Sequence, residues 1–402
     1  MDSKTTGLIH HPYRAPDGFA AVPTAVHKAS TVIFADTNAL HTTDWRGRSA
    51  YTYGLHGTPT TYALQERIAA LEGGLNCLLV PSGLAAINLV DMALLASGDT
   101  VLLPHNAYGP GKELAKHELA RWGIYHAFYD SQDAASLEAA LESASDSTNR
   151  VVWLEAAGSV TMEFPDLPAL LEVCRRHQAI SVLDNTWGAG IAFNPFAIDR
   201  DDAGQPRGVD ISVHALTKYP SGGGDILMGS VTTRDDALHL RLKTCRRHMG
   251  WGVGANDVEF LLRSLPSLAL RYAEHDRSAR VLARWLAQQP QIAQVLHPAL
   301  PGSPGHEHWR SLCGDDGSAA GLFSVIFDAR YSVAQIDAFV DALDLFKIGY
   351  SWAGPVSLVM PYGERTVRAA AAPAAGLVRF SVGLEATDDL VADLQQALSR
   401  LE

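Results

Sequence analysis

The sequence predicts an α/β protein built on a mostly parallel β-sheet, with a smaller C-terminal α+β unit. Between residues 66 and 265, short β-rich runs alternate with helical patterns, as in a parallel sheet covered by helices. The last third returns to longer helical patterns. The 402 residues are 47% hydrophobic and 19% charged, so the chain has enough apolar material for a large core.

The elements are predicted in chain order from periodicity and flanking residues. Residues 84–96, after Pro81-Ser82-Gly83, and residues 166–177, with apolar side chains at helical spacing, are predicted helices. Near the C-terminus, Thr387 is the predicted N-cap of a last helix that has Asp388 and Asp389 in its first turn. The predicted strands are residues 78–80, 101–103, 151–154, 180–183 and 211–213.

Residues 1–60 fit neither a strand nor a helix pattern, because Pro12, Pro16, Pro23 and Pro59 interrupt a stretch rich in Thr, His, Tyr and Gly. We expect this segment to be an arm that another surface orders. The predicted division of the chain is therefore an arm at residues 1–60, a sheet domain at 61–265 and a C-terminal domain at 266–402.

The bulk properties argue against several classes of function. The formal net charge of −12 disfavours a nucleic-acid partner, which usually requires a basic face. Residues 84–96 form the longest apolar stretch, but Asn88 and Asp91 interrupt it, and a membrane helix needs roughly 20 residues. The first thirty residues show no signal-peptide pattern. We expect a cytoplasmic protein without a membrane or nucleic-acid partner.

The four cysteines predict neither a disulfide nor a metal site. Cys77, Cys174, Cys245 and Cys313 lie far apart and form no Cys-x-x-Cys pair. The pair His306 and His308 has no cysteine or carboxylate in ligand spacing. We expect reduced thiols and no metal.

Polar residues directly after predicted strands are the candidates for chemistry, because ligands of open α/β sheets bind at the carboxyl ends of strands. Glu155 and Asp184 occupy such places, and Lys218 lies five residues beyond the predicted strand at 211–213. A lysine with a lowered pKa can form a Schiff base with an aldehyde cofactor and later accept a proton. A buried aspartate can keep a pyridine nitrogen protonated. From spacing alone, a helix-capping Asp184 and a solvated Lys218 remain an open alternative.

The segments Asp184-Asn185-Thr186-Trp187 and Thr217-Lys218-Tyr219 resemble the transsulfuration family of pyridoxal-phosphate enzymes, which includes cystathionine lyases and synthases. Further motifs stand in family order at residues 71–74, 81–83, 106–108, 350–352 and 378–380. The resemblance implies a type I pyridoxal-phosphate fold, similar to aspartate aminotransferase. It makes residues 61–265 the cofactor-binding domain and pyridoxal 5′-phosphate the cofactor.

The resemblance also implies roles for single residues. Lys218 is expected to bind the cofactor aldehyde and act as base, Asp184 to pair with the ring nitrogen, and Tyr108 to stack on the ring. Arg379 is expected to bind the substrate α-carboxylate, which matches the guanidinium fork. The other implied contacts are the amides of Gly83 and Leu84 and the hydroxyl of Thr217 for the phosphate, and Ser351, Tyr350 and Trp352 for the substrate.

In this family the N-terminal arm reaches the neighbouring subunit, where a tyrosine contacts the cofactor phosphate. Tyr53 is the matching residue, and a homotetramer of paired dimers is implied. Two positions depart from the family pattern: Leu55 stands where an arginine normally binds the phosphate, and Ala215 where a serine is common. His56 is one candidate to compensate. Whether Tyr108 or Tyr53 deprotonates the substrate amine stays open.

The segment from Gly158 to Glu163 resembles the Gly-Ser-x-Thr-Met-Glu motif of the β-lyases, whereas γ-acting members usually carry Asn-Pro there. This implies β-elimination of cystathionine to homocysteine, pyruvate and ammonia. A lyase acting on cysteine, cystine or a cysteine S-conjugate, a γ-lyase or γ-synthase, and a fold-sharing regulator without catalysis are the alternatives.

Overall fold

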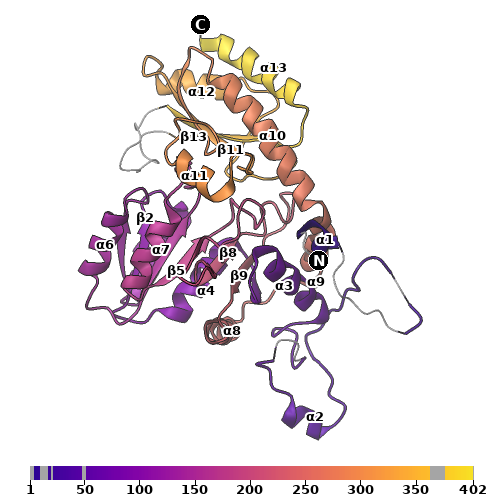
Figure 1. Cartoon of the computed structure of the whole chain (residues 1–402). Helices are drawn as coiled ribbons and strands as arrows, with labels where there is room; N and C mark the ends of the chain where they lie inside the picture. The colour runs from indigo at the N-terminus through magenta and orange to yellow at the C-terminus, as the bar shows by residue number, and fades with distance from the viewer. Residues whose placement is uncertain (1–3, 10–16, 20, 48–50, 363–375, 402) are drawn as a thin grey trace.

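The computed structural model describes residues 4–9, 17–19, 21–47, 51–362 and 376–401. A large unit contains most of the first two thirds of the chain, and a smaller sheet unit lies above it in Figure 1. The long helix α10 (Leu268–Leu286) runs from one unit to the other. The expected α/β architecture is therefore confirmed.

Within the described residues, the large unit holds a seven-stranded sheet of order β1-β9-β8-β5-β4-β2-β3. All pairs from β8 to β3 are parallel, and β9 runs antiparallel to both of its neighbours. The strands are β1 (Asn76–Val80), β2 (Thr100–Pro104), β3 (Tyr125–Tyr129), β4 (Arg150–Glu155), β5 (Ile180–Asp184), β8 (Ile211–His214) and β9 (Gly229–Thr233). A two-stranded ribbon joins β6 (Asp199–Arg200) and β7 (Pro206–Arg207).

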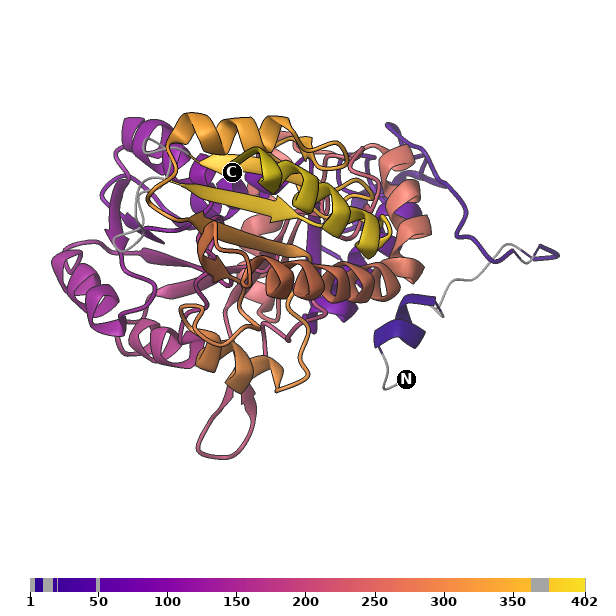
Figure 2. The same ribbon diagram turned by 90° about the horizontal axis from the view of Figure 1, so that it is seen from above.

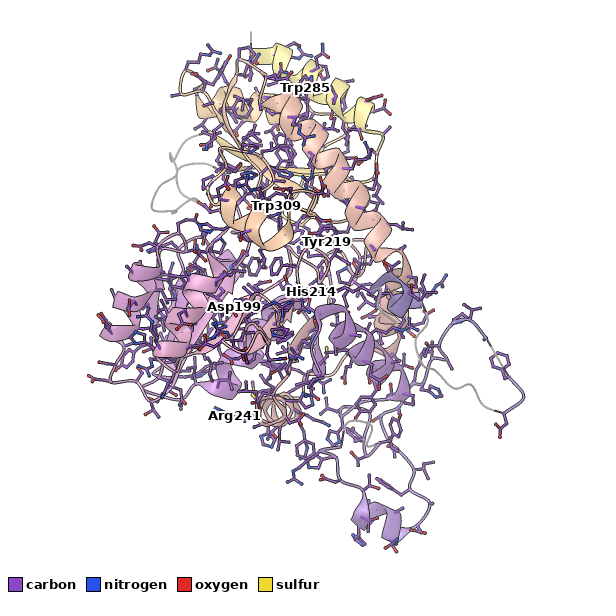
Figure 3. The ribbon with its side chains drawn as sticks, in the orientation of Figure 1. Asp199, His214, Tyr219, Arg241, Trp285 and Trp309 are labelled. Carbon is purple, nitrogen blue, oxygen red and sulfur yellow. The ribbon has the colours of Figure 1, made fainter. Side chains whose placement is uncertain are left out.

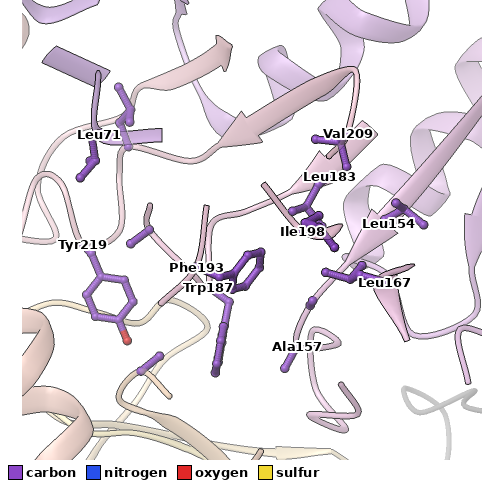
Figure 4. Close-up of a cluster of buried hydrophobic side chains, with 14 of the residues drawn as sticks. Leu71, Leu154, Ala157, Leu167, Leu183, Trp187, Phe193, Ile198, Val209 and Tyr219 are labelled. Atoms are coloured by element: carbon purple, nitrogen blue, oxygen red, sulfur yellow. The ribbon is translucent and has the colours of Figure 1, made fainter. Parts of the chain in front are cut away.

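Both faces of this sheet are buried, as expected for parallel strands. In β4, Val151 and Trp153 belong to one core cluster, and Val152 and Leu154 to the other. Figure 4 shows part of the second cluster, in which Leu154 and Leu183 of the strands lie near Leu167. The first cluster is covered by α4 (Gly83–Leu94), η1 (Ala115–Leu119) and α8 (Asp236–Met249), and the second by α3 (Pro59–Glu72), α6 (Ala134–Ser143), α7 (Leu167–Arg176) and α9 (Ala255–Ser264).

The smaller unit is a sheet of order β10-β11-β14-β13-β12 with helices packed against it. Figure 2 shows α10 and the C-terminal helices lying across these strands. The strands are β10 (Ile292–Leu296), β11 (Leu322–Phe327), β12 (Lys347–Ile348), β13 (Leu358–Tyr362) and β14 (Leu377–Ser381). Besides α10, its helical segments are α12 (Val333–Asp341), α13 (Thr387–Leu398) and η3 (Ser399–Leu401). The segments η2 (Leu265–Ser267) and α11 (His306–Cys313) contribute Leu265 and Trp309 to the core cluster of the large unit.

All five predicted strands are present, as are α4 and α7, whereas β3 and β9 were not predicted. The prediction for Thr387 is wrong, because α13 begins at this residue and Ala386 is its N-cap. The Thr387 hydroxyl instead accepts a hydrogen bond from Arg277 Nη2 at 2.9 Å and contacts Ser278 Oγ. The hydroxyl oxygen that would cap the helix is therefore engaged in tertiary contacts with α10.

The N-terminal segment contains the short helices α1 (Lys4–Ile9) and α2 (Thr37–Thr42). Helix α1 packs against the large unit through the buried side chain of Leu8, whereas the part that contains α2 protrudes from it (Figure 1). Residues 21–47 include no buried side chain. No helix in the part of the chain that the structure describes combines the length and apolar character that a membrane span requires.

Candidate active site

Two adjoining cavities lie at the carboxyl edge of the large sheet and contain most of the predicted site residues. The inner cavity, of about 190 Å³, is lined by Gly83, Leu84, Tyr108, Asp184, Thr217 and Lys218. The outer cavity, of about 420 Å³, adds Tyr350, Ser351, Arg379 and Lys112, while Tyr108, Lys218 and Trp352 line both. His214 and Tyr219, on either side of Lys218 in the sequence, lie close to the junction of the two units in Figure 3.

Lys218 is held between the two cavities by residues of the smaller unit. Its Nζ donates a hydrogen bond to Ser351 Oγ at 2.8 Å and lies 5.2 Å from the centre of the Trp352 ring. Burial lowers the pKa of Lys218 to about 8; the positive charge of Arg379 acts in the same direction, and Asp184 opposes it. A larger fraction of this amine is therefore neutral and nucleophilic at neutral pH than for an ordinary lysine.

Asp184 ends β5, and its carboxylate lines the inner cavity. Burial raises the pKa of Asp184, whereas hydrogen bonds from Thr186 lower it. The Thr186 backbone N–H and hydroxyl both donate to Oδ1, at 3.0 and 2.5 Å. A buried carboxylate of this kind gains most from a cationic partner, which a protonated pyridine nitrogen provides.

Thr186 was quoted in the sequence motif without a role, and the structure shows what it contacts. Its hydroxyl donates to Asp184 and accepts a hydrogen bond from the backbone N–H of Ala215 at 2.9 Å. The side chain therefore joins the ends of β5 and β8. A hydroxyl two residues after the strand-end aspartate was the signal available in the sequence.

The N-terminus of α4 forms one end of the inner cavity. Ser82 is its N-cap and accepts a hydrogen bond from Ala85 N at 3.0 Å. The first N–H groups of a helix have no intrahelical acceptor and favour an anion. A Cβ at Gly83 would lie 2.6 Å from Ala215 Cβ. The first residue of α4 must therefore be glycine for the helix N-terminus to lie this close to Ala215. Thr217 Oγ1 lines the same cavity and accepts from Met228 N at 3.1 Å.

Tyr108 lies at the start of α5 (Gly109–Leu114) and lines both cavities. Its backbone N–H donates to Glu155 Oε2 at 2.7 Å. Burial raises the pKa of the Tyr108 phenol, and the carboxylates of Asp184 and Glu155 raise it further. The strand-end residue Glu155, noticed in the sequence without a role, thus holds the Tyr108 backbone in place.

Arg379 lies in the middle of β14 and is only 5% exposed. Its two terminal nitrogens donate to Ser159 O at 3.2 Å and to Tyr350 O at 2.6 Å. Burial lowers the pKa of Arg379. The backbone carbonyls aim the guanidinium into the outer cavity, where it is available to bind a carboxylate.

The segment from Gly158 to Glu163 joins Tyr108's loop to Arg379. The Glu163 carboxylate accepts a hydrogen bond from Asn106 Nδ2 at 2.9 Å, and Ser159 N donates to Asn106 O at 3.1 Å. A Cβ at Gly158 would lie 2.2 Å from Asn106 Nδ2. Since Ser159 O also accepts from Arg379, this motif aligns the two residues predicted to hold cofactor and substrate.

Tyr53 is the predicted site residue that does not line either cavity of its own chain. It is 45% exposed, accepts a hydrogen bond from Ser30 Oγ at 3.2 Å and pairs with Thr31 in an isolated bridge. Next to it, Leu55 O accepts from Arg246 Nη1 at 3.0 Å. Burial lowers the pKa of His56, and Arg247, Lys243 and Arg246 lower it further.

Comparison with known proteins identifies the family. A family model described as Cys/Met metabolism PLP-dependent enzyme matches residues 5–399. The chain belongs to this family. It is 36% identical to a cystathionine β-lyase of Bordetella avium, covering 100% of this chain and 98% of the relative, and 34% identical to one of Escherichia coli, covering 95% and 94%. A cystathionine γ-synthase structure from Xanthomonas oryzae pv. oryzae, solved with aminoacrylate and cysteine, has a TM-score of 0.87 at 29% identity, covering 99% and 98%.

Pyridoxal phosphate is accordingly the cofactor, and the inner cavity fits it. A helix N-terminus suits the phosphate, a buried carboxylate the ring nitrogen, and an amine with a lowered pKa the aldehyde. The roles of single residues in holding the cofactor stay predictions.

The four cysteine thiols are free, and burial raises the pKa of Cys77 and Cys174 to about 12.

Proposed function

We propose that this protein catalyses β-elimination from amino acids with a sulfur substituent at Cβ, with L-cystathionine as substrate and homocysteine, pyruvate and ammonia as products. The observation that carries the proposal is the position of Lys218. Its amine, with a lowered pKa, hydrogen-bonds to Ser351 and lines both the inner cavity and the outer cavity that contains Arg379.

When bound, pyridoxal phosphate supplies an electron sink for the negative charge that develops at the substrate Cα. We assign the phosphate to the Gly83 and Leu84 amides and the Thr217 hydroxyl, and the ring to Tyr108. Asp184 would hold a proton on the ring nitrogen. Lys218 would bind the aldehyde until substrate arrives.

The chain's own residues then carry out the proton transfers. Arg379 binds the α-carboxylate and so orients Cα, while Ser351 positions the Lys218 amine. Lys218 takes the Cα proton at Nζ, the Cβ–S bond breaks with its electron pair on sulfur, and the sulfur leaves as a thiol after taking up a proton. Water completes the release of ammonia and pyruvate. Positioned proton transfer of this kind contributes about 10²- to 10⁴-fold.

The choice of β- over γ-elimination is supported by the relatives from B. avium and E. coli, which are both named cystathionine β-lyase. The γ-synthase neighbour supports only the steps common to the family. Product analysis with L-cystathionine tests the choice. Pyruvate with homocysteine is expected, whereas 2-oxobutyrate with cysteine would overturn the proposal. Comparable kcat/KM for cysteine or cystine would instead mark a broader C–S lyase.

We also propose that Tyr53 completes the site of a neighbouring subunit, within a homotetramer. The absence of buried side chains over residues 21–47 and the exposure of Tyr53 support this. Mixing Lys218→Ala and Tyr53→Ala subunits tests it. If Tyr53 acts across the interface, mixed dimers regain one intact site, and roughly a quarter of wild-type activity returns on random pairing. Light scattering measures the assembly itself. No regain, or a monomer, would contradict the proposal.

A further inference from the structure

The outer cavity carries more positive charge than a single carboxylate requires. Lys112, Lys218 and Arg379 all line it, and no Asp or Glu stands among its described lining residues. In the proposed function Lys218 serves the cofactor and Arg379 the substrate α-carboxylate. The ammonium of Lys112 is then the cation without an assigned partner.

Lys112 is built into the same turn as Tyr108. Its backbone N–H donates to Tyr108 O at 3.3 Å, and its Nζ donates to His105 O at 2.7 Å. An ammonium has three N–H donors, so two remain. The described residues provide no carboxylate within ion-pair distance of this group.

The charges around Lys112 leave its ammonium undercompensated. Burial lowers the pKa of Lys112; Glu155 and Glu113 raise it, and Lys116 lowers it. Glu113 itself pairs with Lys116 at 3.1 Å, and Glu155 accepts from Tyr108 N. A half-buried cation whose nearby carboxylates are engaged elsewhere is suited to an anionic ligand.

We propose that Lys112 binds a second carboxylate of the substrate, on the far side of the sulfur from the carboxylate held by Arg379. The inference rests on the proposed function and names its substrate class: dicarboxylic amino acids whose leaving thiol carries a carboxylate. A lysine acts as a point charge on a flexible stem, so different lengths between sulfur and carboxylate are accommodated.

Equilibrium binding of a matched ligand pair to the holoenzyme tests this. The probes are L-2-aminoadipate and its neutral side-chain amide, which have the same size and no C–S bond to break. By calorimetry, wild-type protein is expected to bind the acid about ten-fold more tightly, as for one partly exposed charge-assisted hydrogen bond. In Lys112→Met this ratio should fall to about one.

Two variants separate the charge of Lys112 from its packing. Lys112→Arg keeps a cation and should retain most of the ratio, which also covers the case that Lys112→Met fails to fold. Lys116→Met removes a lysine one turn away that pairs with Glu113 on the surface, and should keep the wild-type ratio. Equal binding of the two probes by wild-type protein, or equal loss in both Met variants, would overturn the proposal.

The result is independent of which bond the enzyme breaks, because neither probe is cleaved. A ten-fold ratio that depends on Lys112, together with 2-oxobutyrate from cystathionine, would reject β-elimination and keep the anion site. Pyruvate from cystathionine, together with equal binding of the two probes, would reject the anion site at Lys112 and keep β-elimination.

Discussion

The predicted site has one part at the carboxyl edge of the large sheet and another, Tyr53, in the N-terminal arm. The two parts are held in place in different ways. At the sheet edge, Lys218 donates to Ser351, far away in the chain. Asp184 accepts from Thr186, which in turn accepts from Ala215 N. Arg379, facing them from β14, donates to Ser159 O and Tyr350 O. In the arm, Tyr53 has a bridge to Thr31 and an exposed hydrogen bond to Ser30.

This difference shows how much of the site a single chain can position. A side chain in or near the packed strands takes its place from buried segments around it, so its geometry follows from the fold. Residues 21–47 include no buried side chain, and fixing them costs backbone entropy that burial must offset. Substitutions at the sheet edge should therefore have the larger effects.

The largest expected effect is that of Lys218→Ala. Removing the base should lower kcat with cystathionine by about 10⁴-fold, and the visible absorbance band of the bound cofactor should disappear. Steady-state kinetics and an absorbance spectrum measure both. Lys116→Ala, an exposed lysine, serves as control. A cofactor band that survives in Lys218→Ala means that another lysine binds the aldehyde.

Gly158→Ala should have the next largest effect, since the new Cβ would lie 2.2 Å from Asn106 Nδ2. The loop must shift and move Tyr108 and Arg379, and misplacement by about 1 Å costs on the order of 10² in rate. Thermal unfolding should show a loss of about 1–3 kcal/mol. Gly109→Ala, where nothing lies within 4 Å of the added Cβ, is the matched control. Equal effects of the two substitutions would count against a steric cause.

A third prediction concerns the pH dependence of cofactor uptake by the apoenzyme. The neutral amine of Lys218 is the reactive form, and its pKa is about 8 instead of 10.5. The uptake rate should therefore rise with pH through about 8 and then level off, with a roughly ten-fold increase between pH 7 and 9.

Stopped-flow absorbance measures this profile, and two variants should move it in opposite directions. Arg379→Met removes a charge that lowers the pKa of Lys218 and should shift the profile to higher pH. Asp184→Asn removes a charge that raises this pKa and should shift it to lower pH. A midpoint near 10.5 in wild-type protein would contradict the lowered pKa.

The smallest expected effect lies in the arm. Leu55→Arg restores the arginine of the family pattern and should slow cofactor loss on dialysis by about five-fold, the size of one exposed ionic contact. Leu55→Lys adds a charge without the guanidinium fork and should slow the loss of cofactor by a smaller factor. Equal retention in wild type and Leu55→Arg would indicate that another residue already holds the phosphate; the lowered pKa of His56 disfavours that histidine.

Much of the fold was predictable because it depends on local patterns. The strands that contain Val151, Ile180 and Ile211 are buried on both faces and read as apolar runs. Strand β3 was missed because His126 and Tyr125 make it polar and partly exposed. Strand β9, with the sequence GSVTT, lacks an apolar run and is antiparallel to both of its neighbours.

The sequence by itself determined the α/β class and the places of Asp184 and Lys218 after strands. Only the tertiary structure decided which groups surround them: Thr186 with Ala215, Glu155 with Tyr108, and Glu163 with Asn106. The reason is that helix and strand periods report which face a residue occupies, whereas these contacts join segments far apart in the chain. The antiparallel direction of β9 and the hydrogen bond from Arg277 to the Thr387 hydroxyl also depend on contacts between distant segments, which sequence periodicity does not report.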